Sequence, residues 1–592
     1  MKRFETRLAS KSCHTFKGGS MKRFELVTVL SFTLMAVFVL SGICETHVTG
    51  NVSGTWTMER EPYVADAALS IAQNDTLIIE PGVTVIFPGR YGFTISGILV
   101  AAGTEEDSIF FTARNQHHDA WIGLTFNSMR SSNSIFKYCS VKYAYRGISF
   151  TGASPTVSNC NLAYHENSGL WFRDSRAVVR NSHISDIHAN GVSVEGDSRP
   201  TIEGCQISVC LDQGILVGAG SGAFIIGDTI RHITENGIAL AEAEACSLRS
   251  CLITDVELQG IRVNQSTGVI VLRCIVDGSG RDGIWIYRSE NVSVINSNFM
   301  NGVTTGMYVY ESNVDVINNI IIRNGQDGIG AQGNIIPRLY YNCIWGNSRN
   351  DYNGVNAGNG DINESPDLGE NYIPQEGSRV IDAGDARYRD DDGTRADIGA
   401  RFFNQNHPPR ILSATPEPFD ELVGDQTVEF TVYAEDEDGH NLTYTWLLND
   451  VVADHGNSTE IEFHRDGEYV VKVVVNDGFY MGTTEHSWEF TATGMAVQFE
   501  PDGIPGNFTI SLPYPNPFNA QSSIDLSLKT SSLINLTIFD MQGRMVSHVD
   551  ERILSAGRHN LSINSGSLPS GNYLVIFSIG SEQIVTPVTL IR

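Results

Sequence analysis

Residues 260–287, GIRVNQSTGVIVLRCIVDGSGRDGIWIY, contain one complete copy of a sequence repeat and the start of the next. Two glycines of this stretch, Gly260 and Gly283, belong to a series spaced by 22 or 23 residues. The series is Gly147, Gly169, Gly191, Gly214, Gly237, Gly260, Gly283, Gly306 and Gly328. After each glycine the next and third-next residues are apolar and the residue between them varies. This alternation predicts a short strand with one buried face.

A second repeated position has the same period, with an aliphatic or aromatic residue three before it and two after it in nearly every copy. Its members are Cys139, Cys160, Ser182, Cys205, Asp228, Cys251, Cys274, Ser297, Asn319 and Cys343. Each repeat therefore carries at least two strands. Because so short a unit cannot bury its apolar face alone, it must stack on its neighbours, which predicts a coil of parallel β-structure.

The repeat resembles the right-handed parallel β-helix family, which implies an all-β solenoid. Asparagines just before the second repeated position suit its turns, because Asn tolerates left-handed backbone and hydrogen-bonds locally or with stacked equivalents. They are Asn159, Asn181, Asn296, Asn318 and Asn342. The stretches 76–87, 97–104 and 121–126 resemble opening coils of secreted bacterial β-helix proteins, and 380–400 is similar to their closing segment. We expect the β-helix to span residues 45–402.

Composition limits the choice of partners. The 592 residues include 68 acidic and 40 basic ones, for a net charge of -28, with no block of Lys or Arg. This balance argues against nucleic acid or anionic lipid and favours cations or neutral ligands. Most of the ten cysteines share repeat positions, so we interpret them as small interior residues with free thiols and not as a disulfide framework.

The beginning of the chain predicts export. Met21-Lys22-Arg23-Phe24 repeats the first four residues, and only this second copy directly precedes an apolar run, residues 26–40. A basic start before about 15 apolar-rich residues is typical of a signal peptide and too short for a membrane span. We assign residues 1–44 to a start-site extension and signal peptide, and expect no transmembrane span in the mature chain.

After the repeats the composition changes. Residues 403–409 contain Asn406-His407-Pro408-Pro409, which predicts a stiff linker. Residues 410–493 show short runs of alternating apolar and polar residues separated by acidic and glycine turns, a pattern typical of a β-sandwich. The segments 434–439, 442–446, 467–469 and 475–478 together resemble a PKD or related Ig-like module. In this interpretation Trp446 belongs to the core.

Residues 494–592 carry three ordered motifs, at 512–519, 538–546 and 568–573. They resemble the C-terminal sorting domain of type IX secretion, related to the Ig-like module of the flagellar hook-capping protein. The resemblance implies a second Ig-like β-sandwich, the secretion machinery as a partner, and a secreted or outer-surface bacterial protein; an ordinary terminal sandwich is the alternative. Its motif residues here are Pro515, Asn516, Pro517, Phe518, Asn519, Gly543, Arg544, Gly571 and Tyr573.

Aromatic residues gather at outward positions of two successive coils. They are Trp285, Tyr287, Tyr308 and Tyr310, next to Arg262 and Asn264, with Trp171 and Arg173 at the same repeat positions further up the chain. Exposed aromatic faces with polar neighbours suit stacking against sugar rings, so we predict a polysaccharide or cell-surface glycan as ligand. The alternatives are that another segment covers the patch or that the aromatics stabilise the strands.

Catalysis has weaker support in the sequence. A polysaccharide lyase needs a base together with a cation or Arg, and a glycosidase needs paired carboxylates. The outward positions contain Arg173, Glu195 and Arg262, each alone on its coil. His117-His118-Asp119 is interpreted as a solvated loop. We favour a non-enzymatic binder. A polysaccharide lyase or hydrolase acting on acidic glycans and a structural adhesin are the alternatives.

Two acidic clusters offer the hard oxygens that calcium prefers. The first surrounds Gly393 and the second lies in the sandwich that follows. The residues are Asp385, Asp390, Asp392 and Asp397 in the first cluster, and Asp436, Asp438 and Asp477 in the second. The competing interpretation is acidic turn chemistry. The sequence predicts no other cofactor.

Overall fold

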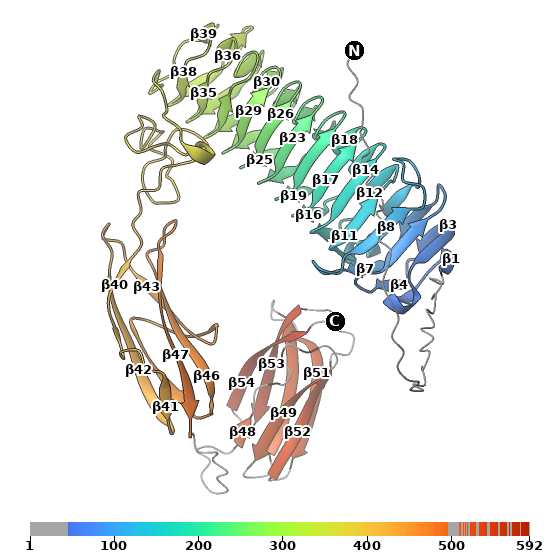
Figure 1. Cartoon of the computed structure of the whole chain (residues 1–592), viewed down its shortest axis with the longest axis vertical. Coiled ribbons are helices and arrows are strands. Elements are labelled where there is room, and N and C mark those ends of the chain that lie inside the picture. Colours follow the sequence, from blue (N-terminus) through green and yellow to red (C-terminus); the bar gives the residue numbers. More distant parts are fainter. Residues whose placement is uncertain are drawn as a thin grey trace, which may run out of the picture. The chain divides into compact units, whose positions relative to one another are not determined.

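The computed structural model describes residues 45–494 and, within 508–590, the strands and a few adjoining residues. Two compact units divide the chain. The first holds the described residues up to His407 with Phe479–Met481, and the second holds Pro408–Gly478 and the described residues from Gly482 onward. Both are built from β-strands (Figure 1), as the sequence predicts.

The first unit is a parallel β-helix solenoid of about 13 turns. Each regular coil has three strands, one more than the two that the repeat pattern required. Face 1 follows the repeat glycine, face 2 comes next, and face 3 leads to the following glycine. Strands on each face pair in parallel with their equivalents on neighbouring coils, so each face is a continuous sheet surface.

The strand bounds are as follows. Face 1 consists of β6 (Gly92–Ile95), β9 (Gly123–Phe126), β12 (Arg146–Thr151), β15 (Ser168–Arg173), β18 (Asn190–Glu195), β21 (Ile215–Val217), β24 (Ile238–Ala241), β27 (Ile261–Asn264), β30 (Ile284–Tyr287), β33 (Met307–Tyr310), β36 (Asp327–Gln332) and β39 (Asn350–Asn353). Face 2 consists of β2 (Gly54–Trp56), β4 (Thr76–Ile79), β7 (Ile98–Ala102), β10 (Ile135–Lys137), β13 (Thr156–Ser158), β16 (Val178–Arg180), β19 (Thr201–Glu203), β22 (Phe224–Ile226), β25 (Ser247–Arg249), β28 (Ile270–Leu272), β31 (Val292–Ile295), β34 (Val314–Ile317) and β37 (Arg338–Tyr340). Face 3 consists of β5 (Thr84–Phe87), β8 (Ile109–Ala113), β11 (Cys139–Lys142), β14 (Asn161–His165), β17 (His183–Ile187), β20 (Gln206–Cys210), β23 (Thr229–Ile233), β26 (Leu252–Val256), β29 (Ile275–Ser279), β32 (Asn298–Met300), β35 (Ile320–Ile322) and β38 (Cys343–Trp345). The solenoid opens with β1 (Thr46–Asn51) and β3 (Tyr63–Ile71), and its short helical turns are η1 (Met58–Arg60), η2 (Arg130–Asn133) and η3 (Glu370–Tyr372).

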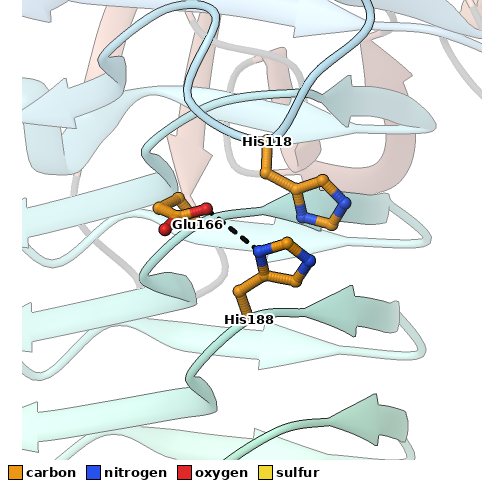
Figure 2. Close-up of side chains that lie close together, drawn as sticks. All are labelled: His118, Glu166 and His188. Carbon is orange, nitrogen blue, oxygen red and sulfur yellow. Dashed lines mark hydrogen bonds and ion pairs between the residues drawn. The ribbon is translucent and has the colours of Figure 1, made fainter.

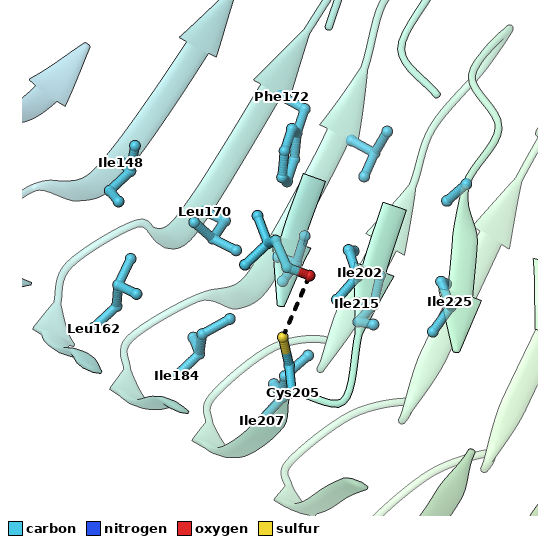
Figure 3. Close-up of a cluster of buried hydrophobic side chains, with 14 of the residues drawn as sticks. Ile148, Leu162, Leu170, Phe172, Ile184, Ile202, Cys205, Ile207, Ile215 and Ile225 are labelled. Carbon is cyan, nitrogen blue, oxygen red and sulfur yellow. Dashed lines mark hydrogen bonds between the residues drawn. The ribbon is translucent and has the colours of Figure 1, made fainter. Parts of the chain in front are cut away.

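The interior is filled by side chains that repeat from coil to coil. Figure 3 shows Leu162, Ile184 and Ile207 following one another on face 3, and the register of β14, β17 and β20 places each opposite the next. The repeat glycine is required at the corner between faces 3 and 1. A Cβ atom on Gly237 would lie 2.5 Å from Ile253 Cγ2 and 2.7 Å from the carbonyl oxygen of Gly260. The coils therefore meet too closely at this corner for any side chain.

The second repeated position forms a buried ladder in the turn between faces 2 and 3. Where it holds a polar side chain, the oxygen accepts a hydrogen bond from the backbone N–H at the same position one coil earlier. Ser182 Oγ accepts from Cys160 at 3.1 Å, Asp228 Oδ1 from Cys205 at 2.6 Å, Ser297 Oγ from Cys274 at 3.1 Å, Asn319 Oδ1 from Ser297 at 2.9 Å, and Asn342 Oδ1 from Asn319 at 2.9 Å.

The ladder position at Asn342 corrects the sequence assignment. Asn342 was expected in the turn and Cys343 in the ladder, but Asn342 occupies the ladder and Cys343 lies opposite Ile320 on face 3. Tyr341 takes the left-handed turn position instead, with φ of 56°. The remaining turn asparagines, Asn159, Asn181, Asn296 and Asn318, have the expected left-handed backbone. All eight cysteines in the described part of the chain are free and buried, and Cys13 and Cys44 lie outside it.

The predicted closing segment lies against the turn asparagines of the last coils. Asn318 Oδ1 accepts a hydrogen bond from the Asp385 N–H at 2.7 Å, and Asn296 Nδ2 donates to the Asp397 carbonyl oxygen at 3.0 Å. Val380 and Ile398 pack with Ile320 in a separate buried cluster. The segment therefore covers the turn between faces 2 and 3 and part of face 3.

The second unit contains two sandwich-like pairs of sheets. In the first pair, β40 (Arg410–Thr415), β42 (Gln426–Glu435) and β45 (Ser458–Phe463) form one sheet, and β41 (Glu421–Val423), β47 (Thr483–Thr493), β46 (Gly467–Asn476), β43 (Thr443–Leu448) and β44 (Val451–His455) form the other. Trp446 is fully buried between them, as predicted. In the second pair, β48 (Phe508–Ile510), β49 (Gln521–Leu528) and β52 (Gly557–Asn564) form one sheet, and β51 (Met545–Leu554), β50 (Ser532–Asp540), β53 (Gly571–Ile579) and β54 (Glu582–Leu590) form the other.

Asp228 is the charged member of the buried ladder. It is 0% exposed, its Oδ2 has no hydrogen-bond partner among the described residues, and burial raises the pKa of its carboxyl to about 7. Because this pKa lies above the value near 4 of an unfolded chain, the folded state holds the proton more tightly. The protonated Asp228 carboxyl therefore contributes fully to the stability of the folded state below about pH 4, and this contribution is lost as the pH rises through about 7.

We predict that Asp228→Asn stabilises the β-helix at pH 8 by about 1–3 kcal/mol, because it removes a buried charge and keeps the acceptor for Cys205. The same arrangement already exists at Asn319, whose Nδ2 donates to the Val294 carbonyl oxygen at 2.8 Å. Thermal unfolding of the full chain between pH 5 and pH 8 measures this, with the exposed Asp255→Asn as the control. A lower midpoint for Asp228→Asn than for the unmodified chain at pH 8 would contradict it.

Candidate functional site

The register of face 1 brings the predicted aromatic residues together. β30 and β33 pair so that Trp285 lies opposite Tyr308 and Tyr287 opposite Tyr310, and all four side chains are half-buried. We call these four residues the aromatic ridge. Arg262 and Asn264 on β27 lie opposite Trp285 and Tyr287, as the repeat predicted.

Most rings of the ridge stack on one another. The Trp285 and Tyr287 rings have centroids 5.1 Å apart and planes within 4°, and Tyr287 and Tyr310 have centroids 5.0 Å apart and planes within 11°. The guanidinium of Arg262 lies 5.4 Å from the Trp285 ring, and that of Arg288 lies 5.1 Å from Tyr287. The ring faces that were predicted to stack against sugars are therefore partly covered by one another.

Tyr308 takes no part in these stacks and borders a hollow of about 590 Å³ together with Trp285. Its hydroxyl donates to Gln332 Oε1 at 2.7 Å, and burial raises its pKa, so the hydroxyl stays protonated. The hollow exists because Gly330, which lies opposite Tyr308 on the next coil, has no side chain. A Cβ atom there would lie 3.2 Å from Tyr308 Cδ2.

The other wall of the hollow is polar and comes mainly from turns and nearby strand positions. Its charged and amide side chains are Gln259, Arg281, Asp282, Gln326, Asp327, Gln332, Arg349 and Asn353. Most of these residues lie outside the outward positions compared in the sequence and were not predicted. Gln332, opposite Tyr310, occupies one of those positions but was not predicted as a site residue. A sequence signal for part of this wall exists: a polar residue stands one position before each of four successive repeat glycines. These residues are Gln259, Asp282, Thr305 and Asp327.

The two carboxylates of the hollow are held by hydrogen bonds. Asp327 is buried and accepts from Arg349 Nε at 2.9 Å and Asn353 Nδ2 at 2.8 Å, and Arg349 lowers the pKa of this carboxyl to about 2. Asp282 Oδ1 accepts from the hydroxyl of Thr304 at 2.6 Å. Asp327 therefore remains ionised down to low pH, which suits a fixed hydrogen-bond acceptor better than a general acid.

A second hollow, of about 770 Å³, borders Tyr310. Its wall includes Arg288, Glu290, Glu311 and Arg338. The aromatic ridge thus has a polar hollow beside Trp285 and Tyr308 and another beside Tyr310.

Trp171 differs from the ridge although it occupies the same repeat position. It is only 8% exposed, because the guanidinium groups of Arg146 and Arg173 lie 4.2 and 5.1 Å from its ring. Arg173 also forms an ion pair with Glu195 at 3.5 Å. The structure therefore separates Trp171 and Arg173 from the ridge: β15 lies five coils before β30 and its tryptophan is covered.

The first acidic cluster uses its carboxylates mostly inside its own loop, and Asp390 also lies 3.9 Å from Arg273 of the β-helix. Asp385 pairs with Arg387, Asp390 Oδ2 accepts from the Asp397 N–H at 2.6 Å, and Asp392 Oδ1 accepts from the Thr394 hydroxyl at 2.7 Å. Burial raises the pKa of Asp390 to about 7 and of Asp397 to about 6. Within the described residues, these four aspartates do not bring three ligand atoms within 4.8 Å of one another.

In the second cluster, Asp436 and Asp438 converge with His440, with ligand atoms within 4.8 Å of one another. Asp477 is not part of this group. Asp436 Oδ1 accepts the backbone N–H groups of Asp438 and His440, each at 3.0 Å.

His118, which the sequence analysis placed in a solvated loop, lies beside Glu166 and His188 (Figure 2). The three residues come from separate coils, so no local motif signals them.

The terminal motif residues fall in the last sandwich. Asn516 Oδ1 accepts from the Thr589 N–H at 2.8 Å, Phe518 and Tyr573 are buried, and Gly571 begins β53. Pro515, Pro517, Asn519, Gly543 and Arg544 lie outside the described residues.

Family models match three parts of the chain. A right-handed β-helix region matches residues 128–223 and 213–365, a PKD domain matches 413–481, and a secretion system C-terminal sorting domain matches 513–590. The chain is therefore a multidomain β-helix protein with a PKD domain and a type IX sorting domain, as the resemblances implied. The sorting domain points to secretion or cell-surface export. The comparisons show no relation to the flagellar hook-capping protein.

Solved structures give distant likenesses. A mutant of the periplasmic alginate epimerase AlgG is 13% identical, with 51% of this chain and 84% of that chain covered and a TM-score of 0.38. The A-module of mannuronan C-5 epimerase AlgE6 from Azotobacter vinelandii is 11% identical, with 54% and 91% covered and a TM-score of 0.32. Tailspike protein 2 of Escherichia coli O157:H7 bacteriophage CAB120 is 10% identical, with 87% and 70% covered and a TM-score of 0.25. Likeness at this level carries no functional argument.

Comparison with curated proteins gives no match. Among the described residues, no helix has the length and apolar character to cross a membrane.

We predict that Asp327→Asn lowers the free energy of unfolding at pH 7 by about 2 kcal/mol, because Arg349 loses its buried anionic partner. The folded pKa of about 2 lies below the unfolded value near 4, so this contribution is present above about pH 4 and is lost as the pH falls toward 2. Denaturant unfolding of the full chain at pH 7 and pH 3 measures it. Asp315→Asn, which breaks the more exposed pair with Arg338, is the control; an equal loss in both variants would contradict the prediction.

Proposed function

We propose that the β-helix binds a polysaccharide or cell-surface glycan in the hollow beside Trp285 and Tyr308, without acting on it. The observation that carries this proposal is the meeting of two aromatic side chains with fixed acceptors and donors in one open hollow. Sugar rings present apolar C–H faces and many hydroxyls, so a wall of this mixed kind suits them.

The polar wall supplies defined hydrogen-bonding roles. The Asp327 carboxylate is ionised and oriented by Arg349 and Asn353, so it is set in place before a ligand arrives. Gln332 is exposed and already accepts from the Tyr308 hydroxyl, which leaves its amide N–H groups available to a sugar hydroxyl. Such preorganisation reduces the entropic cost of binding.

The domain assignment gives this binding an extracellular setting. We propose the boundaries 1–44 for the leader with a signal peptide, 45–402 for the β-helix, 403–409 for the linker, 410–493 for the PKD spacer and 494–592 for the sorting domain. In this arrangement the sorting domain engages the secretion machinery and the β-helix presents its hollow at or beyond the outer cell surface. Calcium at the acidic clusters remains a prediction from the sequence.

The stacked rings favour one competing account. Trp285, Tyr287 and Tyr310 contact one another in the way that cross-strand aromatic pairs stabilise sheets, which is the role expected in a purely structural adhesin. In that account the ridge contributes stability and Tyr308 contributes no affinity. A polysaccharide lyase or hydrolase would instead release products from whatever is bound.

The test compares two tyrosines of the ridge. The full chain is applied to a glycan array and to immobilised polysaccharides, with calcium and with chelator. We expect Tyr308→Ala to weaken retention about 10-fold, because an aromatic contact contributes about 1 kcal/mol or slightly more. The matched variant is Tyr287→Ala, which removes a stacked ring that does not line this hollow. We expect it to lower the unfolding midpoint clearly and the affinity for the glycan only slightly.

Three results would overturn the proposal. Failure of the unmodified chain to retain any glycan, or equal retention by Tyr308→Ala and the unmodified chain, would leave the structural adhesin. Unsaturated sugars or new reducing ends in the retained fraction would show an enzyme. Thermal unfolding of each variant confirms that the β-helix is intact.

A further inference from the structure

A cluster of metal-ligating side chains lies away from the aromatic ridge, where the loop before β9 meets the turns after β14 and β17. His118, Glu166 and His188 each offer one ligand atom, and these atoms lie within 4.8 Å of one another. Figure 2 shows the two imidazole rings one above the other with the Glu166 carboxylate beside them. His188 Nδ1 lies 3.0 Å from Glu166 Oε2, and the two ring centroids are 3.6 Å apart.

The repeat positions two of these ligands. β14 and β17 pair so that His165 lies opposite Ile187, and Glu166 and His188 therefore follow at the same point of successive coils. Equivalent residues of neighbouring coils are about 4.8 Å apart, a separation that two side chains span with one ion between them. Both side chains are nearly half exposed, at 46% for Glu166 and 45% for His188, so an ion has access from solvent.

The third ligand belongs to a loop that is fixed at several points. Next to His118, Asp119 pairs with Arg90 at 3.0 Å and the Ala120 N–H donates to the Tyr143 carbonyl oxygen at 3.1 Å. Trp121 is fully buried, and its Nε1 donates to the Lys142 carbonyl oxygen at 2.7 Å. The loop is therefore held against the coil that follows it, and His118 is placed over His188 before any ion binds.

The donor set selects the class of ion. Two imidazole nitrogens and one carboxylate oxygen suit zinc and similar divalent transition metals, whereas calcium and magnesium prefer oxygen ligands throughout. Bonds of about 2.0–2.2 Å to such an ion place its donors about 3.3 Å apart. Glu166 and His188 are exposed and His118 is half-buried, so the two exposed side chains can rotate toward His118 to reach this spacing.

The ligand count leaves the ion open on one side. Three protein ligands occupy part of the coordination sphere of such an ion, and water completes it on the solvent side. We infer that His118, Glu166 and His188 form a binding site for one divalent transition-metal ion of the zinc class, which ties the 115–120 loop to the two coils beneath it.

The test is zinc titration of the purified, tag-free full chain by calorimetry, with cobalt as a spectroscopic probe. We expect one equivalent of zinc at this site and visible cobalt absorption typical of a nitrogen–oxygen site of low coordination number. His118→Ala and His188→Ala are each expected to weaken that equivalent at least 10-fold, and Glu166→Gln less. His232→Ala removes another exposed histidine with an acidic neighbour, Asp255 at 3.5 Å, and is the matched control.

Folding of each variant is checked by circular dichroism, and His118→Gln supplies a milder change at the same position. Loss of one equivalent in His118→Ala and His188→Ala, but not in His232→Ala, supports the site. Two results would overturn it: no zinc binding by the unmodified chain, or zinc binding that the double variant of His118 and His188 retains in full.

Discussion

Every coil of this β-helix must repeat the backbone path of the one before it, and close contact at one corner enforces that repetition. A side chain at the position of Gly237 would collide with Ile253 and with the backbone of Gly260, so the corner admits only glycine. The buried ladder acts at another corner, where Ser182 or Asn319 satisfies the backbone N–H of the previous coil. Because buried N–H groups need partners, these two constraints together hold neighbouring coils in register.

A fixed register also explains how the surface acquires its sites. Residues 22 or 23 positions apart lie side by side, so Trp285 meets Tyr308 and Glu166 meets His188. A missing side chain has an equally local effect, since Gly330 opens the hollow next to Tyr308. Function on such a fold is determined by substitutions at a few repeat positions, and the core beneath remains nearly unchanged.

The sequence predicted much of this architecture, since a repeat with apolar alternation has few structural solutions. It predicted the parallel coil, the ridge on β30 and β33 and the buried Trp446. It did not predict the third strand of each coil, because strands of three residues are too short to show alternation. The shift that puts Asn342 in the ladder was missed because the last repeats differ in length by one residue.

The candidate sites were predicted less completely, for reasons of geometry. Repeat position gives the direction of a side chain but not what covers it, and Trp171 lies beneath Arg146 and Arg173. His118 comes from a loop with no counterpart in later coils, so its approach to His188 has no periodic signal. The acidic residues near Gly393 were counted as free oxygens, whereas their hydrogen bonds to the surrounding loop depend on its folded path.

Amide hydrogen exchange of the full chain, with and without the polysaccharide that it retains best, locates the bound glycan on the β-helix. Binding in the hollow beside Trp285 and Tyr308 predicts slower exchange on β30 and β33 and in the turns that carry Asp282 and Asp327, with no change around Glu166 and His188. Protection confined to other coils or to the second unit would contradict it, and so would the absence of any protected segment in the β-helix.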